Sequence, residues 1–315
     1  MKAPARRGAA AHASVRSRLI VGLDVPSLAD AERLVDLLRD EVGAFKVGKQ
    51  LFVHAGPAVL RMIHDRGAKV FLDLKFHDIP RTVARAALEA TRLGVWMFNV
   101  HASGSFEMMR VTVDEVNRLC RKEGLARPKI LAVTVLTSLS REDLKRVGVQ
   151  SGVESQVVRL ARLAHEAKMD GVVASPHEVA RIRRECGRDF LIVTPGVRPK
   201  QADWADQKRV LTPAEAIRAG ADYLVVARPI VDAKDPVAAS REIVAEMDRA
   251  FTARGKSSLR LLRSRAADRA GRRDPALGAR DALERTGDQA PRPCPGARPR
   301  GAQDPRLIPN ARINV

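Results

Sequence analysis

The sequence predicts an α/β protein that folds as a TIM (β/α)8 barrel, a closed ring of eight parallel strands with helices around it. Between residues 18 and 252, short aliphatic and β-branched runs alternate with longer amphipathic stretches. Eight such units in about 235 residues fit this barrel in number and length. An open doubly wound sheet is the alternative, but no GxGxxG follows the first strand. The expected strands are 18–25, 44–48, 69–75, 95–101, 129–136, 171–175, 190–197 and 222–228.

Capping residues mark where the helices between these strands begin. Ser27 precedes "LADAERLVDLL", and Thr212 with Pro213 precedes "AEAIRAG", so each pair of signals predicts a helix start. After Pro80 the apolar residues recur at helical spacing. The residues of that stripe are Ile79, Val83, Ala86, Ala87, Ala90 and Leu93. The glycines expected near helix ends, just before the next strand, are Gly67, Gly94, Gly171 and Gly220.

The composition is that of a protein with a sizeable aliphatic core. Apolar residues make up 45% of the chain but aromatic residues only 3%, which suits helices packed closely on a parallel sheet. Cys120, Cys186 and Cys294 lie far apart, without the spacing of a disulfide framework or a metal site. This usage is typical of a reducing compartment and predicts a cytoplasmic protein without a bound metal. No run approaches the roughly 18 apolar residues of a membrane span.

The two ends of the chain differ from the barrel segment at 18–252. Residues 1–17 are basic and lack an apolar h-region, which predicts a disordered leader, with a transit peptide as the alternative. Residues 253–315 are poor in large apolar groups and predict a disordered tail, whose first part, to about Leu283, could form a basic helix. Of the net charge of +19, residues 1–18 contribute +5 and residues 254–315 contribute +9. Nucleic-acid binding through the tail is therefore an alternative function, disfavoured by the mild charge of the barrel segment.

Charged side chains gather where the first three predicted strands end, which in a TIM barrel is the mouth of the active site. Asp24 ends the first strand, Lys46 the second, and Asp73 and Lys75 the third. Asp73 and Lys75 are two residues apart, so strand alternation predicts that both point to the same face. Asp78 follows the strand and could reach this pocket or that of a neighbour. We therefore predict an alternating network of Lys46, Asp73, Lys75 and Asp78.

A phosphate site is expected on the other side of this mouth. The seventh strand runs into "TPGVRP", with Gly196 and Arg198, and the eighth into "VVARP", with Ala227 and Arg228. TIM barrels often bind phosphate in the loops after these two strands, where arginines and backbone N–H groups suit a dianion. The fourth and fifth strands add further polar residues to the mouth. These are Asn99, His101, Thr137 and Ser138.

The motif D-x-K-x-x-D-I-P-x-T, which runs from Asp73 to Thr82, resembles the signature of the orotidine 5′-phosphate decarboxylase family. The resemblance covers roughly residues 18–250, through "GLDV", "FKVGKQLF", "VTVLTS", "TPGVRP", "DQKRVLTP" and "VVARP" in that order. Related sugar-phosphate enzymes share the shorter D-x-K-x-x-D, so the longer motif is the specific one. The resemblance implies a decarboxylation of orotidine 5′-phosphate to uridine monophosphate (UMP) that needs no cofactor.

The resemblance also implies roles for individual residues. Lys75 would stabilise the carbanion at pyrimidine C6 and then protonate it, while Asp73 would lie near the substrate carboxylate. In a homodimer, Asp78, Ile79 and Thr82 would come from the partner subunit. The remaining implied contacts are Asp24 and Lys46 with the ribose hydroxyls, Thr137 and Ser138 with the pyrimidine, and Arg198, Gln207, Arg228 and the N–H of Ala227 with the phosphate.

One residue departs from the family pattern, and the motifs do not assign a role to three others. Position 227 is often Gly in the family, and an Ala there would cost about 1 kcal/mol if the backbone needs a positive φ. His77 occupies a variable position of the motif and is expected in a turn, His101 could shape the pocket, and Trp204 lies in the loop expected to close over the phosphate.

A Mg²⁺-dependent sugar-phosphate lyase on the same barrel is the second enzyme hypothesis, and its activity would be lost in EDTA.

Overall fold

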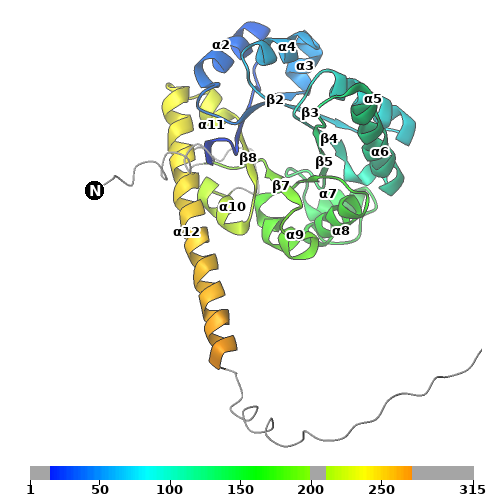
Figure 1. Ribbon diagram of the computed structural model, residues 1–315. Coiled ribbons are helices and arrows are strands. Elements are labelled where there is room, and N and C mark those ends of the chain that lie inside the picture. The colour runs from blue at the N-terminus through cyan, green and yellow to red at the C-terminus, as the bar shows by residue number, and fades with distance from the viewer. Residues whose placement is uncertain (1–14, 199–210, 272–315) are drawn as a thin grey trace, which may run out of the picture. The chain divides into compact units, whose positions relative to one another are not determined.

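The computed structural model describes residues 15–198 and 211–271, with side chains to residue 253. Eight parallel strands form a closed barrel, in which each strand pairs with the next and β8 pairs with β1 (Figure 1). Closure confirms the predicted TIM barrel and excludes the open doubly wound sheet. The strands are β1 (Leu19–Gly22), β2 (Ala44–Gly48), β3 (Val70–Phe76), β4 (Met97–His101), β5 (Lys129–Val133), β6 (Gly171–Val173), β7 (Leu191–Thr194) and β8 (Tyr223–Val226).

Helices follow the strands and surround the barrel (Figure 1). They are α2 (Leu28–Leu38), α3 (Lys49–Ala55), α4 (Ala58–Asp65), α5 (Pro80–Arg92), α6 (Phe106–Glu123), α7 (Arg141–Arg146), α8 (Val153–Glu166), α9 (Val179–Cys186), α10 (Pro213–Ala219), α11 (Arg228–Val231) and α12 (Pro236–Gly271), with short 3-10 turns at Ala102–Gly104 and Pro176–Glu178. Both predicted caps are confirmed. The Ser27 hydroxyl accepts the N–H of Asp30 at 3.1 Å, and Thr212 forms a reciprocal capping box with Glu215.

The glycines before the strands fall into two groups. Gly67, Gly94 and Gly220 have φ values of 72°, 73° and 119°, as predicted for residues that end a helix. Gly171 differs from the prediction because it begins β6, and an added Cβ would lie 2.2 Å from the carbonyl oxygen of Leu191. Its role is the close approach of β6 to β7, and the left-handed residue after α8 is Lys168, with φ 62°.

The apolar residues form two buried clusters on the two faces of the barrel wall. The larger cluster joins the strands to the helices and includes Val21, Phe45 and Phe98. The smaller cluster takes residues from seven of the strands and includes Phe71 and Val225, which also line the cavities at the mouth. The barrel interior is therefore a packed core below the mouth, as in other TIM barrels. Its members are Ile20, Ala44, Phe71, Met97, Leu131, Val193 and Val225.

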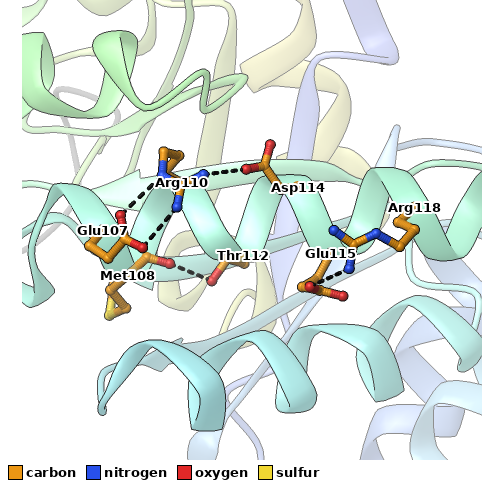
Figure 2. A network of polar contacts seen from close by, with 7 residues as sticks. All are labelled: Glu107, Met108, Arg110, Thr112, Asp114, Glu115 and Arg118. Atoms are coloured by element: carbon orange, nitrogen blue, oxygen red, sulfur yellow. Dashed lines mark hydrogen bonds and ion pairs between the residues drawn. The ribbon is translucent and has the colours of Figure 1, made fainter. Parts of the chain in front are cut away.

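Helix α6 shows how the outer layer separates a buried face from a charged one. Met108 and Thr112 are buried, and the Thr112 hydroxyl donates to the carbonyl oxygen of Met108 at 2.7 Å (Figure 2). On the solvent side, Arg110 pairs with Glu107 and Asp114 at 2.8 and 2.7 Å, and a further arginine–glutamate pair follows along the helix (Figure 2). Such exposed pairs at helical spacing contribute about 0.2–0.5 kcal/mol each, so packing rather than charge holds α6 on the barrel.

The predicted limits of the barrel segment differ from the structure at both ends. Val15 is buried in the larger cluster, so the packed chain begins before the expected limit at residue 17. The chain divides into two compact units, Met1–Arg263 and Ser264–Val315. Residues 253–271, the part of the tail in which the sequence allowed a basic helix, continue helix α12, because their Ala, Arg, Leu and Lys residues favour helix. The rest of the expected leader and tail, with Cys294, lies outside the described residues.

Cys120 and Cys186 are both free thiols. Within residues 15–198 and 211–271, no helix combines the length and the apolar character that crossing a bilayer requires.

Candidate functional site

The ends of β2, β3 and β4 bring the predicted charged residues together at the mouth of the barrel. Gly48 of β2 is in register with Asp73 of β3, which sets Lys46 and Asp73 on neighbouring strands. Asn99 lies on β4, the next strand around the barrel (Figure 1). Because these strands are parallel and adjacent, their carboxyl ends place the side chains within contact distance.

Four of these side chains form an alternating chain of charges. Lys46 Nζ lies 3.0 Å from Asp24 Oδ1 and 3.5 Å from Asp73 Oδ2. Lys75 Nζ lies 2.6 Å from Asp73 Oδ1. The side chains of Lys46 and Asp73 are only 11% and 12% exposed, whereas that of Asp24 is 50% exposed. Three members of the predicted network, Lys46, Asp73 and Lys75, are therefore in contact, and Asp24 extends the chain toward solvent.

Lys75 reaches Asp73 through an irregular backbone rather than through simple strand alternation. Its φ is 55°, in the left-handed region that only a few per cent of non-glycine residues occupy. The pairing of β3 with β4 shifts register between Leu72 and Phe76, so the ladder is interrupted at Lys75. The two side chains meet, as predicted, but regular strand alternation does not by itself explain the contact, because the backbone at Lys75 is not that of a regular strand. A left-handed residue at this point is a conformation that the surrounding structure must hold in place.

Asn99 is fully buried and makes the two contacts that accompany this irregularity. Its Oδ1 accepts the backbone N–H of Lys75 at 2.8 Å, and its Nδ2 donates to Asp73 Oδ1 at 2.7 Å. The sequence indicated only that Asn99 lies at the end of a strand. The signal that could have identified it is an amide side chain on the strand next to an acid–amine pair.

One cavity that the described residues form at this mouth has a volume of about 180 Å³ and is mostly apolar. Lys46, Asp73 and Lys75 line one side of it. Its apolar wall includes Phe71, Val133, Val135, Val173, Ala174 and Val225. We call it the apolar cavity. Thr137, one of the two residues expected beside the pyrimidine, lines this cavity, whereas Ser138, the other, is exposed and is not among the lining residues.

The second cavity, of about 220 Å³, lies beside the first and is more polar. Arg198, Ala227 and Arg228 line it, which brings together three of the residues predicted to bind phosphate. Asp24, Lys46 and Asp73 form its border, and Lys46 and Asp73 also line the apolar cavity. We call this second space the rim cavity. The two cavities therefore meet at the Lys46–Asp73 pair.

Ala227 does not adopt the left-handed backbone that favours glycine. Its φ is −119°, so the structure does not need the positive φ that would make alanine costly there. Close approach instead restricts a different residue, Gly22 at the end of β1. A Cβ added to Gly22 would lie 3.0 Å from Lys46 Cε and 3.0 Å from the Cβ of Ala227. Gly22 therefore gives Lys46 the room to cross toward Asp73.

The second half of the signature motif lies outside these cavities within the single chain. Asp78, Ile79 and Thr82 are exposed, and none of them lines the apolar cavity or the rim cavity. Asp78 Oδ1 accepts the N–H of Ile79 at 2.6 Å, and Ile79 is 67% exposed. The structure therefore does not bring Asp78 into the charge chain of its own barrel. Gln207 and Trp204 lie outside the described residues.

His101 lies near the charge chain without lining either cavity. Its ring centroid is 5.3 Å from that of His77. Burial, followed by the nearby charges of His77, Lys75 and Lys49, lowers the pKa of His101 from 6.5 to about 4. His101 is therefore neutral at physiological pH. Among residues 15–198 and 211–253, no group of three or more His, Cys, Asp or Glu side chains is arranged to hold a metal ion.

Comparison with known proteins identifies relatives along most of the chain. A sequence model described as the orotidine 5′-phosphate decarboxylase / HUMPS family matches residues 17–243. The orotidine 5′-phosphate decarboxylase of Geobacter sulfurreducens is 57% identical over 232 residues, which cover 74% of this chain and 96% of that protein. The enzyme of the same name from Syntrophotalea carbinolica is 59% identical and covers 74% of this chain and 95% of its own length.

A solved structure agrees with these sequence matches. The crystal structure of orotidine 5′-phosphate decarboxylase from Lactobacillus acidophilus aligns with a TM-score of 0.64 and 37% sequence identity. The alignment covers 73% of this chain and 98% of that one. The similarity therefore spans nearly the whole length of the relatives and, in this chain, the segment that forms the barrel.

Proposed function

The chain belongs to the orotidine 5′-phosphate decarboxylase family, and we propose that it carries out the decarboxylation step of pyrimidine synthesis by holding Lys75 against C6 of orotidine 5′-phosphate. The observation that carries this proposal is the Lys46–Asp73–Lys75 chain at the junction of the two cavities. Relatives that are 57% and 59% identical favour this substrate over the sugar phosphates of the related lyases.

The two cavities fit the two chemically different ends of the substrate. The rim cavity offers Arg198, Arg228 and the backbone at Ala227 to the phosphate dianion. The apolar cavity offers Thr137 to the polar edge of the pyrimidine, while Lys75 and Asp73 face the carbon that loses CO2. Asp24 and Lys46, which border the rim cavity, would take the ribose hydroxyls between them. Phosphate binding far from C6 then supplies energy for orienting the ring.

The chemical step follows from the charge of Lys75. Cleavage of the C6–carboxylate bond releases CO2 and leaves the bonding electron pair on C6, with no group on the substrate to delocalise it. The Lys75 ammonium stabilises this pair and then gives it a proton, and the neutral amine regains a proton from water. Asp73 holds Lys75 in place at 2.6 Å. The apolar wall excludes water, so a fixed cation acts more strongly there than it would in solvent.

We propose that no metal or cofactor takes part in this reaction. Asp24 and Asp73, the carboxylates that line the cavities, each lie within 3.5 Å of a lysine ammonium. A divalent cation between them would be repelled by Lys46 and Lys75. The proposal differs here from the Mg²⁺-dependent lyase hypothesis, which requires carboxylates available as ligands.

We also propose that two copies of the chain share their active sites. Asp78, Ile79 and Thr82 are exposed beside the mouth and line neither cavity of their own barrel. An isoleucine that is 67% exposed in a signature motif is accounted for if a second copy covers it. In that dimer Asp78 would complete the alternation as the acid that follows Lys75. We also keep the proposal that Gln207 binds the substrate phosphate.

The test is the loss of orotidine 5′-phosphate absorbance with pure protein in EDTA. We expect turnover by the unaltered chain and its loss in Lys75→Ala. A cation about 4 Å from the developing charge contributes about 4 kcal/mol at an effective dielectric constant of about 20, which is about 10³-fold in rate. Loss of the proton donor adds about 10²–10⁴-fold.

Lys69→Ala is the matched control for this test. Lys69 precedes the same strand at the opposite end of the barrel, where its Nζ lies 5.6 Å from the ring centroid of Trp96. Its truncation should leave turnover unchanged. Full activity in Lys75→Ala would refute the role of Lys75, and turnover that requires added Mg²⁺ would favour the lyase hypothesis.

A further inference from the structure

Asn99 occupies a position from which a single side chain contacts both members of the acid–amine pair. It is 0% exposed, on β4, and lines neither the apolar cavity nor the rim cavity. Its carboxamide oxygen accepts the N–H of Lys75, and its carboxamide nitrogen donates to Asp73. Because a carboxamide is planar and carries one donor and one acceptor side, these two bonds fix its orientation.

The first contact meets a need created by the interruption of the β3–β4 ladder. In a regular parallel ladder, a backbone N–H of β3 would find a carbonyl oxygen on β4. The register shifts between Leu72 and Phe76, and the amide hydrogen of Lys75 goes to the Asn99 side chain instead. A buried amide without an acceptor is costly, and so is a non-glycine residue with φ 55°. Asn99 thus stabilises the conformation that turns Lys75 toward the cavity.

The second contact fixes the rotation of the Asp73 carboxylate, whose two oxygens face different lysines. Oδ1 of Asp73 receives Lys75 Nζ at 2.6 Å and Asn99 Nδ2 at 2.7 Å, while Oδ2 faces Lys46 Nζ at 3.5 Å. Rotation of this carboxylate would break the Asn99 bond together with the Lys75 bond. The amide of Asn99 therefore holds Asp73 in the rotation that serves both amines.

We propose that Asn99 is a positioning residue for the decarboxylation, which clamps the left-handed backbone of Lys75 and the carboxylate of Asp73 in one geometry. The proposal rests on the catalytic role of Lys75 given above. In this proposal Asn99 acts through Lys75 and Asp73 and not by touching the substrate, since it is fully buried and lines neither the apolar cavity nor the rim cavity. Its loss should therefore affect the chemical step and spare binding.

Kinetics of Asn99→Leu and Asn99→Asp test this split. The leucine variant keeps the volume and loses both hydrogen bonds, and we expect kcat to fall about 100-fold with KM within about threefold, as for a small misplacement of a reacting group. The control is Thr194→Val, because Thr194 is also a buried polar residue at a strand end, and its hydroxyl has no partner among the described residues. This control should keep both constants. A folded leucine variant with unaltered kcat would overturn the proposal.

The aspartate variant adds a pH readout that a structural role alone would not change. It keeps an oxygen for the Lys75 amide but can donate to Asp73 only when one of the two carboxyl groups holds a proton. We therefore expect its kcat, relative to that of the unaltered chain, to rise at least tenfold between about pH 8 and about pH 5. A ratio that stays flat over this range would contradict the clamp. This variant also serves if Asn99→Leu does not fold.

Amide hydrogen exchange separates this proposal from the proposed function. The backbone N–H of residue 75 should be protected in the unaltered chain and in Asn99→Asp, and should exchange at least tenfold faster in Asn99→Leu. If Lys75→Ala still turns over substrate, the catalytic role fails while the exchange result still decides the Asn99 contact. Equal exchange in all three proteins would overturn the clamp even if Lys75 is catalytic.

Discussion

Mixing two inactive variants tests whether the active site is shared between subunits. Lys75 contacts Asp73 within one chain at 2.6 Å, whereas Asp78 is exposed and lines neither cavity of its own chain. If Asp78 serves the partner's barrel, a dimer of one Lys75→Ala chain and one Asp78→Ala chain contains one site with both defects and one site with neither. Random assortment makes about half of the dimers mixed, so about a quarter of all sites are restored.

The assay is orotidine 5′-phosphate turnover after the two variants are unfolded together and refolded. We expect about 25% of wild-type activity, and about 50% per dimer when mixed dimers are isolated by two different tags. The control is Lys75→Ala mixed with Asp73→Ala. Both residues belong to one barrel, so every mixed dimer then carries one defect in each site. Activity restored by this control, or no restoration by the Asp78→Ala pair in a verified dimer, would refute the shared site.

Two further predictions concern stability and the packing around Lys46. The pKa of His101 is lowered to about 4, so between about pH 6.5 and pH 4 the unfolded chain binds more protons and stability falls as the pH falls. Because His101 is half-buried and therefore partly screened by solvent, we expect this change to lower the free energy of unfolding by about 1–2 kcal/mol. Melting curves of His101→Gln, measured over the same pH range, should lack this contribution. Equal pH dependence in the two proteins would contradict this assignment. For Gly22→Ala, contacts of 3.0 Å to Lys46 and Ala227 predict about 1–3 kcal/mol of destabilisation and a severalfold higher KM. Gly152→Ala has open space around its Cβ but removes a favourable N-cap residue of α8, so it should lower stability by up to about 1 kcal/mol and leave KM unchanged.

The elements of the barrel could be predicted from the sequence because their signals are local. Ser27 and Thr212 cap helices within three residues of their own position, and the strand residues are aliphatic runs long enough to stand out. The polar strand ends followed from one topological rule, that parallel strands of a barrel end at one rim. This rule alone is enough to predict that Lys46, Asp73 and Lys75 lie together.

What could not be predicted depends on pairing between distant segments. The left-handed backbone of Lys75 arises from a register shift against β4, and the sequence of β3 alone reads as regular alternation. The partnership of Asn99 depends on that same shift. Likewise Asp78 was expected either in its own pocket or in a neighbour's, because the direction of the turn after β3 is not set by residue spacing. The limits of the barrel moved to Val15 and into α12 because burial and helix propensity extend beyond the family motifs.

The shared wall between the apolar cavity and the rim cavity has a consequence for inhibitor design. Both cavities are lined by Lys46, Asp73, Pro195 and Val225, so a compound that reaches from one cavity to the other lies against these four residues. A flat heterocycle for the first cavity and an anionic group for the second can be found as separate weak fragments. Joining them with a linker that spans this wall makes the second binding event intramolecular, so the affinity of the joined compound gains from a high effective concentration. The linker length then becomes the variable to optimise.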